Sequence, residues 1–459
     1  MSTNQGIRPA RSGEQATTPP AGRRPRLPGR VRDDARSTVY WGAAHGLPRV
    51  AVRTAARRGD LQGRLIVAGA GGGEVWDAVE QVRAAGPLYR GRFAFLTVDH
   101  AVTREVLASG DFRAGSPVRT GGLLGGLMAR TAPDLLHPME PPSLLVTEPP
   151  MHTRHRQLVS RVFTARAVQN LRARTEQIAS ELLDGLVTAE PVDLVAAYCA
   201  LLPVTVISEI LGVPPGERPR VLALGSAVAP SLDFGLGFRQ FRSVTAALRD
   251  FESWLTGHLA RLRREPGDDL LSQLIVARDQ DGGLDESELK SIAGLVLAAG
   301  FETTVNLLGN GIALLSRFPE QLGRLRGQPE LWPGAVEEIL RIDPPVLLTG
   351  RISIRDLDVR GVAVPAGSYV VTVLAGANRD PKVFAEPETF DVARANARDH
   401  VSFSAGRHFC LGASLARMEG EVGLRAFFDR YPDVTMLPGA RRRANRVLRG
   451  WSRLPARLS

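Results

Sequence analysis

The sequence has few of the features that mark secreted or membrane proteins. Its 459 residues include two cysteines, too few for a disulfide framework. The apolar stretch from Ile292 to Phe301 ends at Glu302 after ten residues, whereas a membrane-spanning helix needs about 20. The first 30 residues contain no apolar run that could serve as a signal sequence. We therefore expect a cytoplasmic protein without a membrane span.

Aromatic residues are also scarce, at 6% of the chain, which is too few for a base-stacking platform. The formal charge of +10 would suggest a polyanion as partner, but the charge is local. Residues 1–38 carry eight Arg against three acidic residues, and residues 441–459 carry seven Arg and no acidic residue. The rest of the chain is close to neutral, so we predict no nucleic-acid partner.

Helical periodicity dominates from Tyr40 onward, as in AALRDFESWLTGHLARLRRE and AVEEILRI, where apolar residues recur three and four positions apart. Strand patterns are confined to residues 87–99 and 356–373. We predict one large, mainly α-helical domain with small β-sheets over residues 39–459, behind a disordered basic tail rich in Pro, Gly and Arg at residues 1–38. Residues 112–146 are rich in Gly and Pro and are expected to be irregular.

The stretch FSAGRHFCLG holds Cys410 between Gly406 and Gly412, directly before a helical pattern. Glycines permit unusual backbone angles and close approach, and a helix start offers N–H groups that favour a thiolate. A lone cysteine is more often a buried small apolar residue. The two glycines and the helix start favour a functional thiolate here.

A second stretch, AAGFETTVNLLGNG, interrupts an apolar helix with Glu302 and Thr303. A carboxylate within such a run is costly unless it is solvated or used. The Thr303 hydroxyl can donate to the carbonyl of Ala299 and bend the helix beside Gly300. The pair is a candidate proton relay, and a polar stripe facing an internal water is equally compatible with this stretch.

Two further stretches carry weaker signals. EEILRIDPP places Glu338 and Arg341 three apart on one helical face, a spacing that is usually an exposed pair of little energetic value. EPPMHTRHRQLV places His152 and Arg156 four apart, so that the two side chains could bind an anion together. A solvated basic face is the ordinary alternative.

Together and in this order, the four stretches resemble the cytochrome P-450 superfamily of haem-thiolate monooxygenases, in its soluble bacterial type, over about residues 40–459. The resemblance implies a single triangular-prism catalytic domain, with haem b between a proximal cysteine loop and a long distal helix. By this resemblance Cys410 is the iron ligand, and Thr303 with Glu302 is the oxygen-activating acid-alcohol pair. The other residues implied to contact haem are Phe403, Gly406, Gly412, His408, His152, Arg156, Arg351, Ala299 and Gly300.

The resemblance also implies a structural ion-pair network of Glu338, Arg341 and a third partner, Arg394. Two positions depart from the family pattern, because Ser404 stands where many relatives have Gly and Glu148 stands where an Asp commonly precedes Pro-Pro. We expect small differences in the geometry of the cysteine loop at Ser404.

The implied activity is insertion of one oxygen atom of O2 into a hydrophobic small molecule, with electrons from NAD(P)H delivered by a separate ferredoxin and ferredoxin reductase. Cationic side chains expected near the proximal face could steer an acidic ferredoxin, and they are Arg154, His155, Arg407 and Arg417. The apolar segments expected to line the substrate pocket are residues 112–147 and 229–238, Leu295, Ala299, and Val346 to Leu348.

Three alternatives remain open from the sequence. A thiol-dependent transferase or hydrolase would use Cys410 with His408 as base, but this leaves the other three stretches unexplained. A non-enzymatic haem sensor would explain the haem contacts but not Glu302 and Thr303. A related haem-thiolate chemistry, such as carbon–carbon coupling, dehydration or peroxide use, would keep every assignment.

Overall fold

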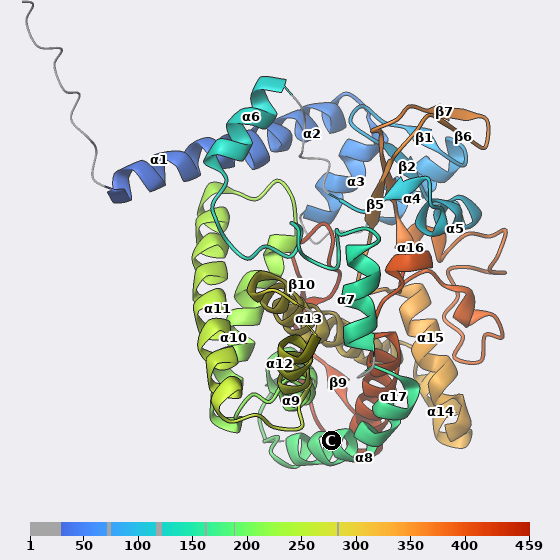
Figure 1. Ribbon diagram of the computed structural model, residues 1–459. Coiled ribbons are helices and arrows are strands. Elements are labelled where there is room, and N and C mark those ends of the chain that lie inside the picture. The colour runs from blue at the N-terminus through green and yellow to red at the C-terminus, as the bar shows by residue number, and fades with distance from the viewer. Residues whose placement is uncertain (1–28, 71–74, 116–121, 161–162, 188, 282–283) are drawn as a thin grey trace, which may run out of the picture.

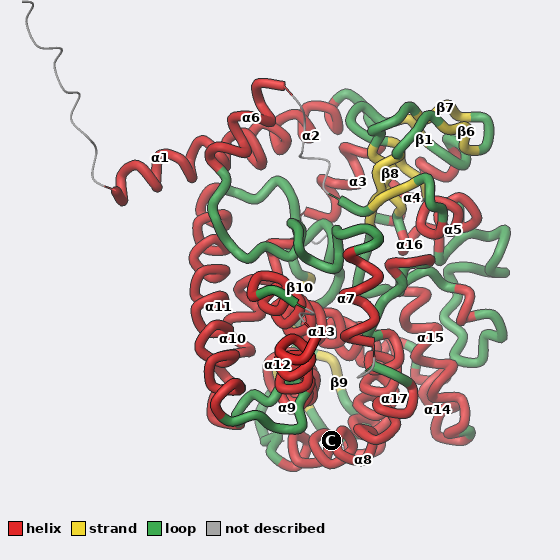
Figure 2. Tube along the Cα trace, viewed as in Figure 1, coloured by secondary structure: helices red, strands yellow, loops and turns green. Residues whose placement is uncertain are grey.

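A computed structural model of the chain describes residues 29–70, 75–115, 122–160, 163–187, 189–281 and 284–459. The chain is mainly α-helical with small β-sheets, as the sequence predicts (Figures 1 and 2). The helices in the first half are α1 (Gly29–Trp41), α2 (Leu47–Arg57), α3 (Leu61–Ala70), α4 (Trp76–Ala84), α5 (His100–Ala108), α6 (Gly122–Thr131), α7 (Met151–Ser160), α8 (Ala165–Asp184), α9 (Leu201–Ile210) and α10 (Arg218–Val228). The later helices are α11 (Phe238–Arg264), α12 (Leu270–Asp281), α13 (Glu286–Arg317), α14 (Pro319–Gly327), α15 (Trp332–Ile342), α16 (Leu374–Ala377) and α17 (Ala413–Arg430).

Short turns of other helix types join these elements. Two have the wider π-helical turn, η1 (Gly42–Gly46) and η2 (Val195–Cys199). The others have the tighter 3-10 turn, and they are η3 (Pro215–Glu217), η4 (Ala229–Leu232), η5 (Pro329–Leu331), η6 (Ala397–Asp399) and η7 (Gly406–His408).

The β-structure is confined to four small sheets. The largest has the strand order β1-β2-β8-β5-β3, and only its β2–β8 pair is parallel. Its strands are β1 (Tyr89–Arg90), β2 (Phe95–Thr97), β3 (Phe112–Arg113), β5 (Thr349–Ser353) and β8 (Tyr369–Thr372). The other strands are β4 (Val192–Asp193), β6 (Leu357–Val359), β7 (Val362–Val364), β9 (Thr435–Met436), β10 (Arg441–Arg442), β11 (Trp451–Arg453) and β12 (Pro455–Arg457). Both predicted strand regions are therefore confirmed. Strand β5 was missed although it has five residues, and the other strands outside the predicted regions have only two or three residues, too few for a period-2 signal.

The predicted boundary of the tail is wrong for its last ten residues. Helix α1 begins at Gly29, so residues 29–38 are helical, while residues 1–28 of the expected tail lie outside the described residues. Tertiary contacts with α6 and α11 stabilise a segment whose Arg-rich and Asp-rich composition gave no apolar period. The segment 112–146 is likewise less irregular than expected, since it contains α6.

Helix α13 lies near the centre of the molecule and organises its core (Figure 1). It packs against α9, α11, α15 and α17, and Asp285 caps its start in a reciprocal arrangement with Glu288. It is the one helix among the described residues that is long and apolar enough to cross a membrane, and 67% of its most apolar window is buried inside the protein. Burial in the core therefore accounts for its apolar character.

The C-terminal arginines fold back onto acidic residues of the body. Four of them form ion pairs: Arg442 and Arg449 with Asp343, Arg443 with Glu302, and Arg446 with Asp233. The carboxylates that they bind are buried. Much of the C-terminal positive charge thus neutralises internal carboxylates and is not offered to an external polyanion.

Candidate active site

Cys410 lies in a tight loop between η7 and α17. The N–H of Cys410 donates to the carbonyl of Phe403 over 2.9 Å, and the N–H of Phe409 donates to the carbonyl of Gly406 over 3.0 Å. Helix α17 begins three residues after the cysteine, at Ala413. The predicted placement of the sulfur on a turn before a helix is confirmed.

Cys410 is the exposed one of the two cysteines. The residue is open to solvent, yet the surrounding protein removes enough water to raise the pKa of its thiol. The backbone N–H of Gly412 and the charges of Arg156 and Arg417 act in the opposite direction and favour the thiolate. The other cysteine, Cys199, is fully buried and its thiol pKa is raised by burial. Only Cys410, of the two, can reach a ligand.

The two glycines of the loop have different roles. Gly406 has φ +67°, and a β-carbon there would lie 2.7 Å from Cα of Ala108 at the end of α5, so both its backbone angle and its packing require glycine. Gly412 has the ordinary φ of −86°, and a β-carbon there would contact nothing within 4 Å. The expectation of an unusual backbone angle at Gly412 is therefore wrong, and open space lies in front of this residue beside the sulfur.

Ser404 adopts the left-handed backbone conformation, with φ +65°, which explains why glycine is common at this position. Its hydroxyl oxygen accepts a hydrogen bond of 3.4 Å from Nη2 of Arg351. The serine therefore combines a strained backbone with a weak contact to a predicted haem-binding arginine.

Replacing Ser404 with glycine is expected to raise the free energy of unfolding by about 0.5–1 kcal/mol, because relief of the left-handed strain outweighs the added flexibility of the unfolded chain. Denaturant unfolding of the holoenzyme, followed by circular dichroism, measures this change. Ser404→Ala is the control, since it removes the hydroxyl and keeps the strain. A loss of stability in Ser404→Gly would show that the Arg351 contact outweighs the strain.

Two side chains near the loop lack an anionic or hydrogen-bond partner among the described residues: Arg351 has no carboxylate partner, and one ring nitrogen of His152 has no hydrogen bond. Arg351, on β5, is buried, and burial lowers its pKa; no carboxylate among the described residues forms an ion pair with it. His152, on α7, is buried, and its Nε2 atom has no hydrogen-bond partner. Burial and the neighbouring His408 and Arg156 lower the pKa of His152 to about 4. An anion bound between these side chains would balance the charge of Arg351 and give the Nε2 atom of His152 a hydrogen-bond partner.

The chain itself supplies one carboxylate to this region. His408 lies against His152, with ring centroids 4.5 Å apart, and its Nε2 atom is 3.2 Å from Oε1 of Glu148. Arg407 donates to Oε2 of the same carboxylate over 2.8 Å. Glu148 therefore holds the two side chains in place, a role that sequence reasoning missed because the partners are about 260 residues apart.

Arg156 donates to the carbonyl of Phe409 over 2.8 Å, so it fixes the cysteine loop directly.

On α13 the predicted geometry is present at Thr303. Its hydroxyl donates to the carbonyl of Ala299 over 2.9 Å. Leu295, Ala299 and Thr303 are half-buried, and their spacing of four places them on one face; Val296, Ala298 and Gly300 beside them are half-buried too. Gly300 is different, because a β-carbon there would lie 3.1 Å from the side chain of Ile207 on α9. The structure thus gives Gly300 a helix-packing contact.

Glu302 is directed away from this open face. It is 2% exposed, and its Oε1 atom is 3.2 Å from Nε of Arg443. Burial raises the pKa of Glu302, and the Arg443 charge partly opposes that shift. Neither carboxylate oxygen has a hydrogen-bond partner among the described residues. Glu302 and Thr303 are therefore neighbours in sequence with different surroundings, and water would have to connect them.

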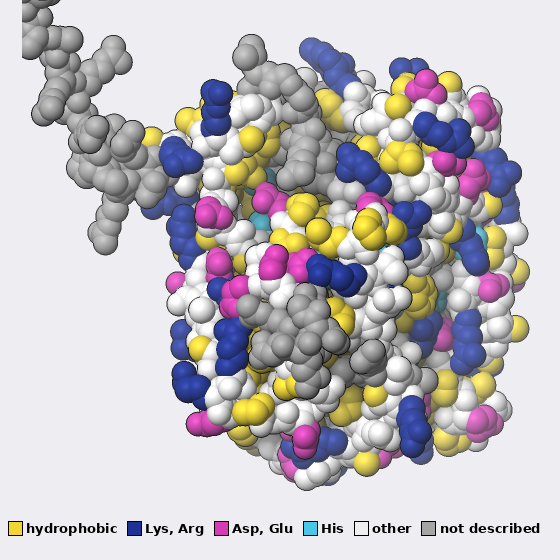
Figure 3. Space-filling model, in the orientation of Figure 1, with side chains coloured by type: hydrophobic (Ala, Val, Ile, Leu, Met, Phe, Trp, Pro, Cys, Tyr) yellow, Lys and Arg dark blue, Asp and Glu magenta, His cyan; other side chains and the backbone are white. Residues whose placement is uncertain are grey.

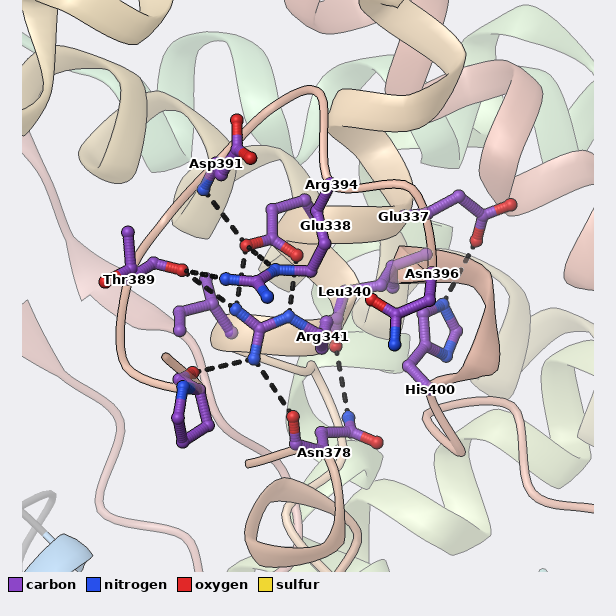
Figure 4. A network of polar contacts seen from close by, with 12 residues as sticks. Glu337, Glu338, Leu340, Arg341, Asn378, Thr389, Asp391, Arg394, Asn396 and His400 are labelled. Carbon is purple, nitrogen blue, oxygen red and sulfur yellow. Dashed lines mark hydrogen bonds and ion pairs between the residues drawn. The ribbon is translucent and has the colours of Figure 1, made fainter. Parts of the chain in front are cut away.

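The predicted ion-pair network forms in full (Figure 4). Arg341 donates from Nε and Nη2 to the two oxygens of Glu338 over 2.6 and 2.7 Å, and Arg394 donates to Oε1 over 3.1 Å. Arg341 also donates to backbone carbonyls of Asn378, Pro387 and Thr389. Since these groups belong to the chain that leads to the cysteine loop, the network joins α15 to that segment.

A second carboxylate on α15 supports the loop from the other side and was not predicted. Glu337 accepts from Nε of Arg417 over 2.8 Å and lies 3.1 Å from Nε2 of His400. The guanidinium of Arg417 in turn lies over the ring of Phe403, 4.5 Å from its centroid. The adjacent acids Glu337 and Glu338 therefore bind different partners, which an i, i+3 pattern could not reveal.

The four cations expected to steer a redox partner are all engaged within the chain. Arg154 and His155 both bind Glu288 at the start of α13, and His155 is fully buried. Arg407 binds Glu148 and Arg417 binds Glu337, as described above. Arg154, Arg407 and Arg417 stay partly exposed beside these acids, whereas His155 is not available to an external partner.

This arrangement fits haem. A single open sulfur can supply one ligand, and no cluster of three or more His, Cys, Asp or Glu side chains able to hold a metal ion occurs within the described residues. A metal at Cys410 would therefore need ligands from a cofactor. Arg351 and the unpaired nitrogen of His152 offer two positions for anionic groups of that cofactor.

Comparison with known proteins gives a consistent result. The family model of cytochrome P450 matches residues 330–443. Cytochrome P450 140 of Mycobacterium tuberculosis is 53% identical over 432 residues, which are 92% of this chain and 97% of that protein. The 6-deoxyerythronolide B hydroxylase of Saccharopolyspora erythraea is 42% identical over 316 residues, which are 68% of this chain and 77% of that protein.

The fold is also similar to solved structures. A ligand-free structure of CYP164A2 from Mycobacterium smegmatis superposes with a TM-score of 0.78 at 30% identity, covering 87% of this chain and 99% of that chain. The likeness therefore extends over nearly the whole of that structure, and not only over the cysteine loop.

Proposed function

This chain belongs to the cytochrome P450 family, and from this premise we propose that it inserts one oxygen atom of O2 into a hydrophobic small molecule. The family is one of haem-containing oxidoreductases, and the relatives include a hydroxylase. The observation that carries the proposal is the exposed sulfur of Cys410, which lies near side chains that could bind an anion. The long central helix α13 also has a half-buried, mainly apolar face. A thiol-dependent transferase is not supported, because His408 binds Glu148 instead of Cys410.

Haem b would be held by Cys410 at its iron and by Arg351, His152, Arg156 and His408 at its propionates. Bound haem supplies the metal that activates O2 and makes the transfer of oxygen possible. The chain's own contribution is a set of groups that oppose the effect of burial, which raises the pKa of the Cys410 thiol. The N–H of Gly412 and the charges of Arg156 and Arg417 favour the thiolate, as expected for a ligand that donates electron density.

Thr303 and Glu302 are proposed to deliver protons to the oxygen site. Thr303 is half-buried on the open face of α13, where its hydroxyl can exchange its bond to Ala299 for one to a water or to substrate oxygen. The raised pKa of the Glu302 carboxyl allows it to hold and release a proton closer to neutral pH than an exposed glutamate. The charge of Arg443 limits how far the pKa of Glu302 rises, so that the carboxyl can both bind and release a proton during turnover.

We propose a predominantly apolar substrate, because Leu295 and Ala299 form the open face of α13 and Val346 is half-buried after α15. Electrons would come from NAD(P)H through a ferredoxin and its reductase in the cytoplasm. Arg154, Arg407 and Arg417 bind acids of the chain but stay partly exposed, so they are proposed as contacts for the ferredoxin, whereas His155 is buried.

The function is tested by replacing Thr303 with alanine. The amount of product formed per electron consumed is expected to fall by at least about tenfold, because a positioned proton donor typically contributes more than that. The rate of NAD(P)H consumption should fall much less, with the missing electrons appearing as hydrogen peroxide. The measurement compares product, peroxide and NAD(P)H in one reaction.

Thr304→Val is the matched control. Thr304 is the next residue on α13, is buried, and donates to the carbonyl of Gly300 in the same way over 3.2 Å. Its replacement changes the same helix without touching the open face, so coupling should stay near that of the unchanged protein. Equal coupling in Thr303→Ala and the unchanged protein would contradict the proposed role of Thr303.

A further inference from the structure

Helix α2 exposes two large aliphatic side chains to solvent. Leu47 is 62% exposed and Val50 is 64% exposed, which are among the highest values for apolar residues of this protein. Three exposed arginines follow on the same side of the helix, at positions 53, 57 and 58. The solvent-facing side of α2 thus carries both apolar and cationic side chains, whereas that side of an ordinary amphipathic helix is mainly polar.

The opposite side of α2 is fixed against α3. Ala55 is buried, and a β-carbon on Gly63 of α3 would lie 2.6 Å from the backbone nitrogen of Ala56. Such close packing leaves no freedom for α2 to rotate and hide Leu47 or Val50. The apolar side chains are therefore held outward by the fold.

The turn between β1 and β2 extends this surface. Asp60, which follows α2, accepts hydrogen bonds from the Arg92 N–H and the Tyr89 hydroxyl, so the turn is tied to the end of the helix. At the tip of this turn Phe93 is 47% exposed beside the exposed Arg92. We call the combined surface the α2 face, and it consists of Leu47, Val50, Arg53, Arg57, Arg58, Arg92 and Phe93.

The α2 face has almost no negative charge. Residues 47–70 contain five arginines and a single acidic residue, Asp60, whose carboxylate already accepts the bonds described above and one from the N–H of Gly63. Figure 3 shows Lys and Arg side chains together with apolar ones along the upper edge of the view, with Asp and Glu side chains among them at the upper right. Aliphatic and aromatic groups among arginines on a convex helix are what a surface of anionic lipid binds.

We propose that the α2 face docks the protein on the surface of a bilayer that contains anionic lipid. Leu47, Val50 and Phe93 enter the boundary between headgroups and acyl chains, and the arginines bind lipid phosphates. The docking does not depend on the proposed function. If that function holds, docking also places the enzyme where a hydrophobic substrate is concentrated.

An acidic protein partner fits this surface less well. A ferredoxin has to approach the cysteine loop to pass an electron, whereas Figure 1 shows α2 at the opposite end of the molecule from α17, which follows that loop. The exposed apolar residues also lie apart from one another, with Leu47 and Val50 in the first turn of α2 and Phe93 on a separate turn, whereas a protein interface usually has a compact cluster of anchors.

The test is co-sedimentation of the full-length holoenzyme with vesicles. One set is pure phosphatidylcholine and the other is three parts phosphatidylcholine to one part phosphatidylglycerol. We expect binding to the anionic vesicles at about 0.1 M salt, weaker binding as salt rises, and little binding to the neutral vesicles. No binding to the anionic vesicles would overturn the proposal.

Variants assign the binding to the α2 face. Replacing Arg53, Arg57 and Arg58 together with Gln should weaken binding by about fivefold for each arginine, and Leu47→Ser with Val50→Ser should weaken it at every salt concentration. Val187→Ser is the control, because Val187 is 67% exposed but follows α8, at the other end of the molecule from α2. The absorption spectrum of each variant shows whether its haem site is intact.

Two results would refute the assignment. If the α2 variants bind anionic vesicles as the unchanged protein does, the basic terminal segments or another surface carry the binding. If they bind vesicles normally but lose reduction by ferredoxin, the α2 face is a protein interface.

Discussion

Replacing Arg341 with alanine is expected to lower the free energy of unfolding by about 3–5 kcal/mol, a large part of the total stability of a typical domain. The side chain is fully buried and makes five hydrogen bonds, two to Glu338 and three to backbone carbonyls. Its removal leaves the buried Glu338 carboxylate with Arg394 as its cationic partner, and leaves the carbonyls of Asn378 and Pro387 without this donor, while that of Thr389 keeps a bond from Arg394 (Figure 4). Denaturant unfolding and the yield of folded protein measure the loss.

Arg324→Ala is the matched control for that variant. Arg324 also binds a carboxylate, Asp391, over 2.7 Å, but both side chains are largely exposed. An exposed pair contributes about 0–1 kcal/mol, so this variant should be nearly as stable as the unchanged protein. Arg341→Lys keeps the charge but cannot reproduce the fork of donors, and should resemble Arg341→Ala more than the unchanged protein. Full stability in Arg341→Ala would contradict a structural role for the network.

Replacing Cys410 with serine is expected to abolish product formation while leaving the fold intact. Cys410 is open to solvent, so the change of side chain disturbs little packing. A serine hydroxyl stays protonated at neutral pH and cannot supply the anionic, electron-donating ligand that favours cleavage of the O–O bond. The measurement is the spectrum of the reduced protein with carbon monoxide, where the strongly red-shifted band of a thiolate ligand should disappear.

Cys199→Ala separates this effect from the general loss of a thiol. Cys199 is fully buried in the main core, and its truncation should reduce stability moderately without moving the spectrum. A red-shifted band that persists in Cys410→Ser, or disappears in Cys199→Ala, would contradict the assignment of Cys410 as ligand.

Local chemistry explains what could be predicted from the sequence. The bond from Thr303 to Ala299 spans four residues of one helix, and the turn at Cys410 is set by Gly406 and by the helix that follows. The ion pair between Arg394 and Glu338 could be predicted only through the family resemblance, since neither stretch carries a sequence signal that relates it to the other.

Contacts between distant segments could not be predicted. The pairing of Glu302 with Arg443 and that of Glu148 with His408 and Arg407 depend on how the whole chain folds back on itself. The helix over residues 29–38 escaped detection for a similar reason, because α1 is stabilised by contacts with α6 and α11 and not by an apolar period of its own.

The pairing of C-terminal arginines with buried carboxylates also leaves an asymmetric distribution of charge over the molecule. With Arg442, Arg443, Arg446 and Arg449 matched by internal acids, much of the uncompensated positive charge of the described chain remains near α2 and α3. A molecule of this kind has a permanent dipole moment and experiences a torque near any charged plane. It would turn its N-terminal helices toward a negative surface within about one Debye length, before any side chain touches it.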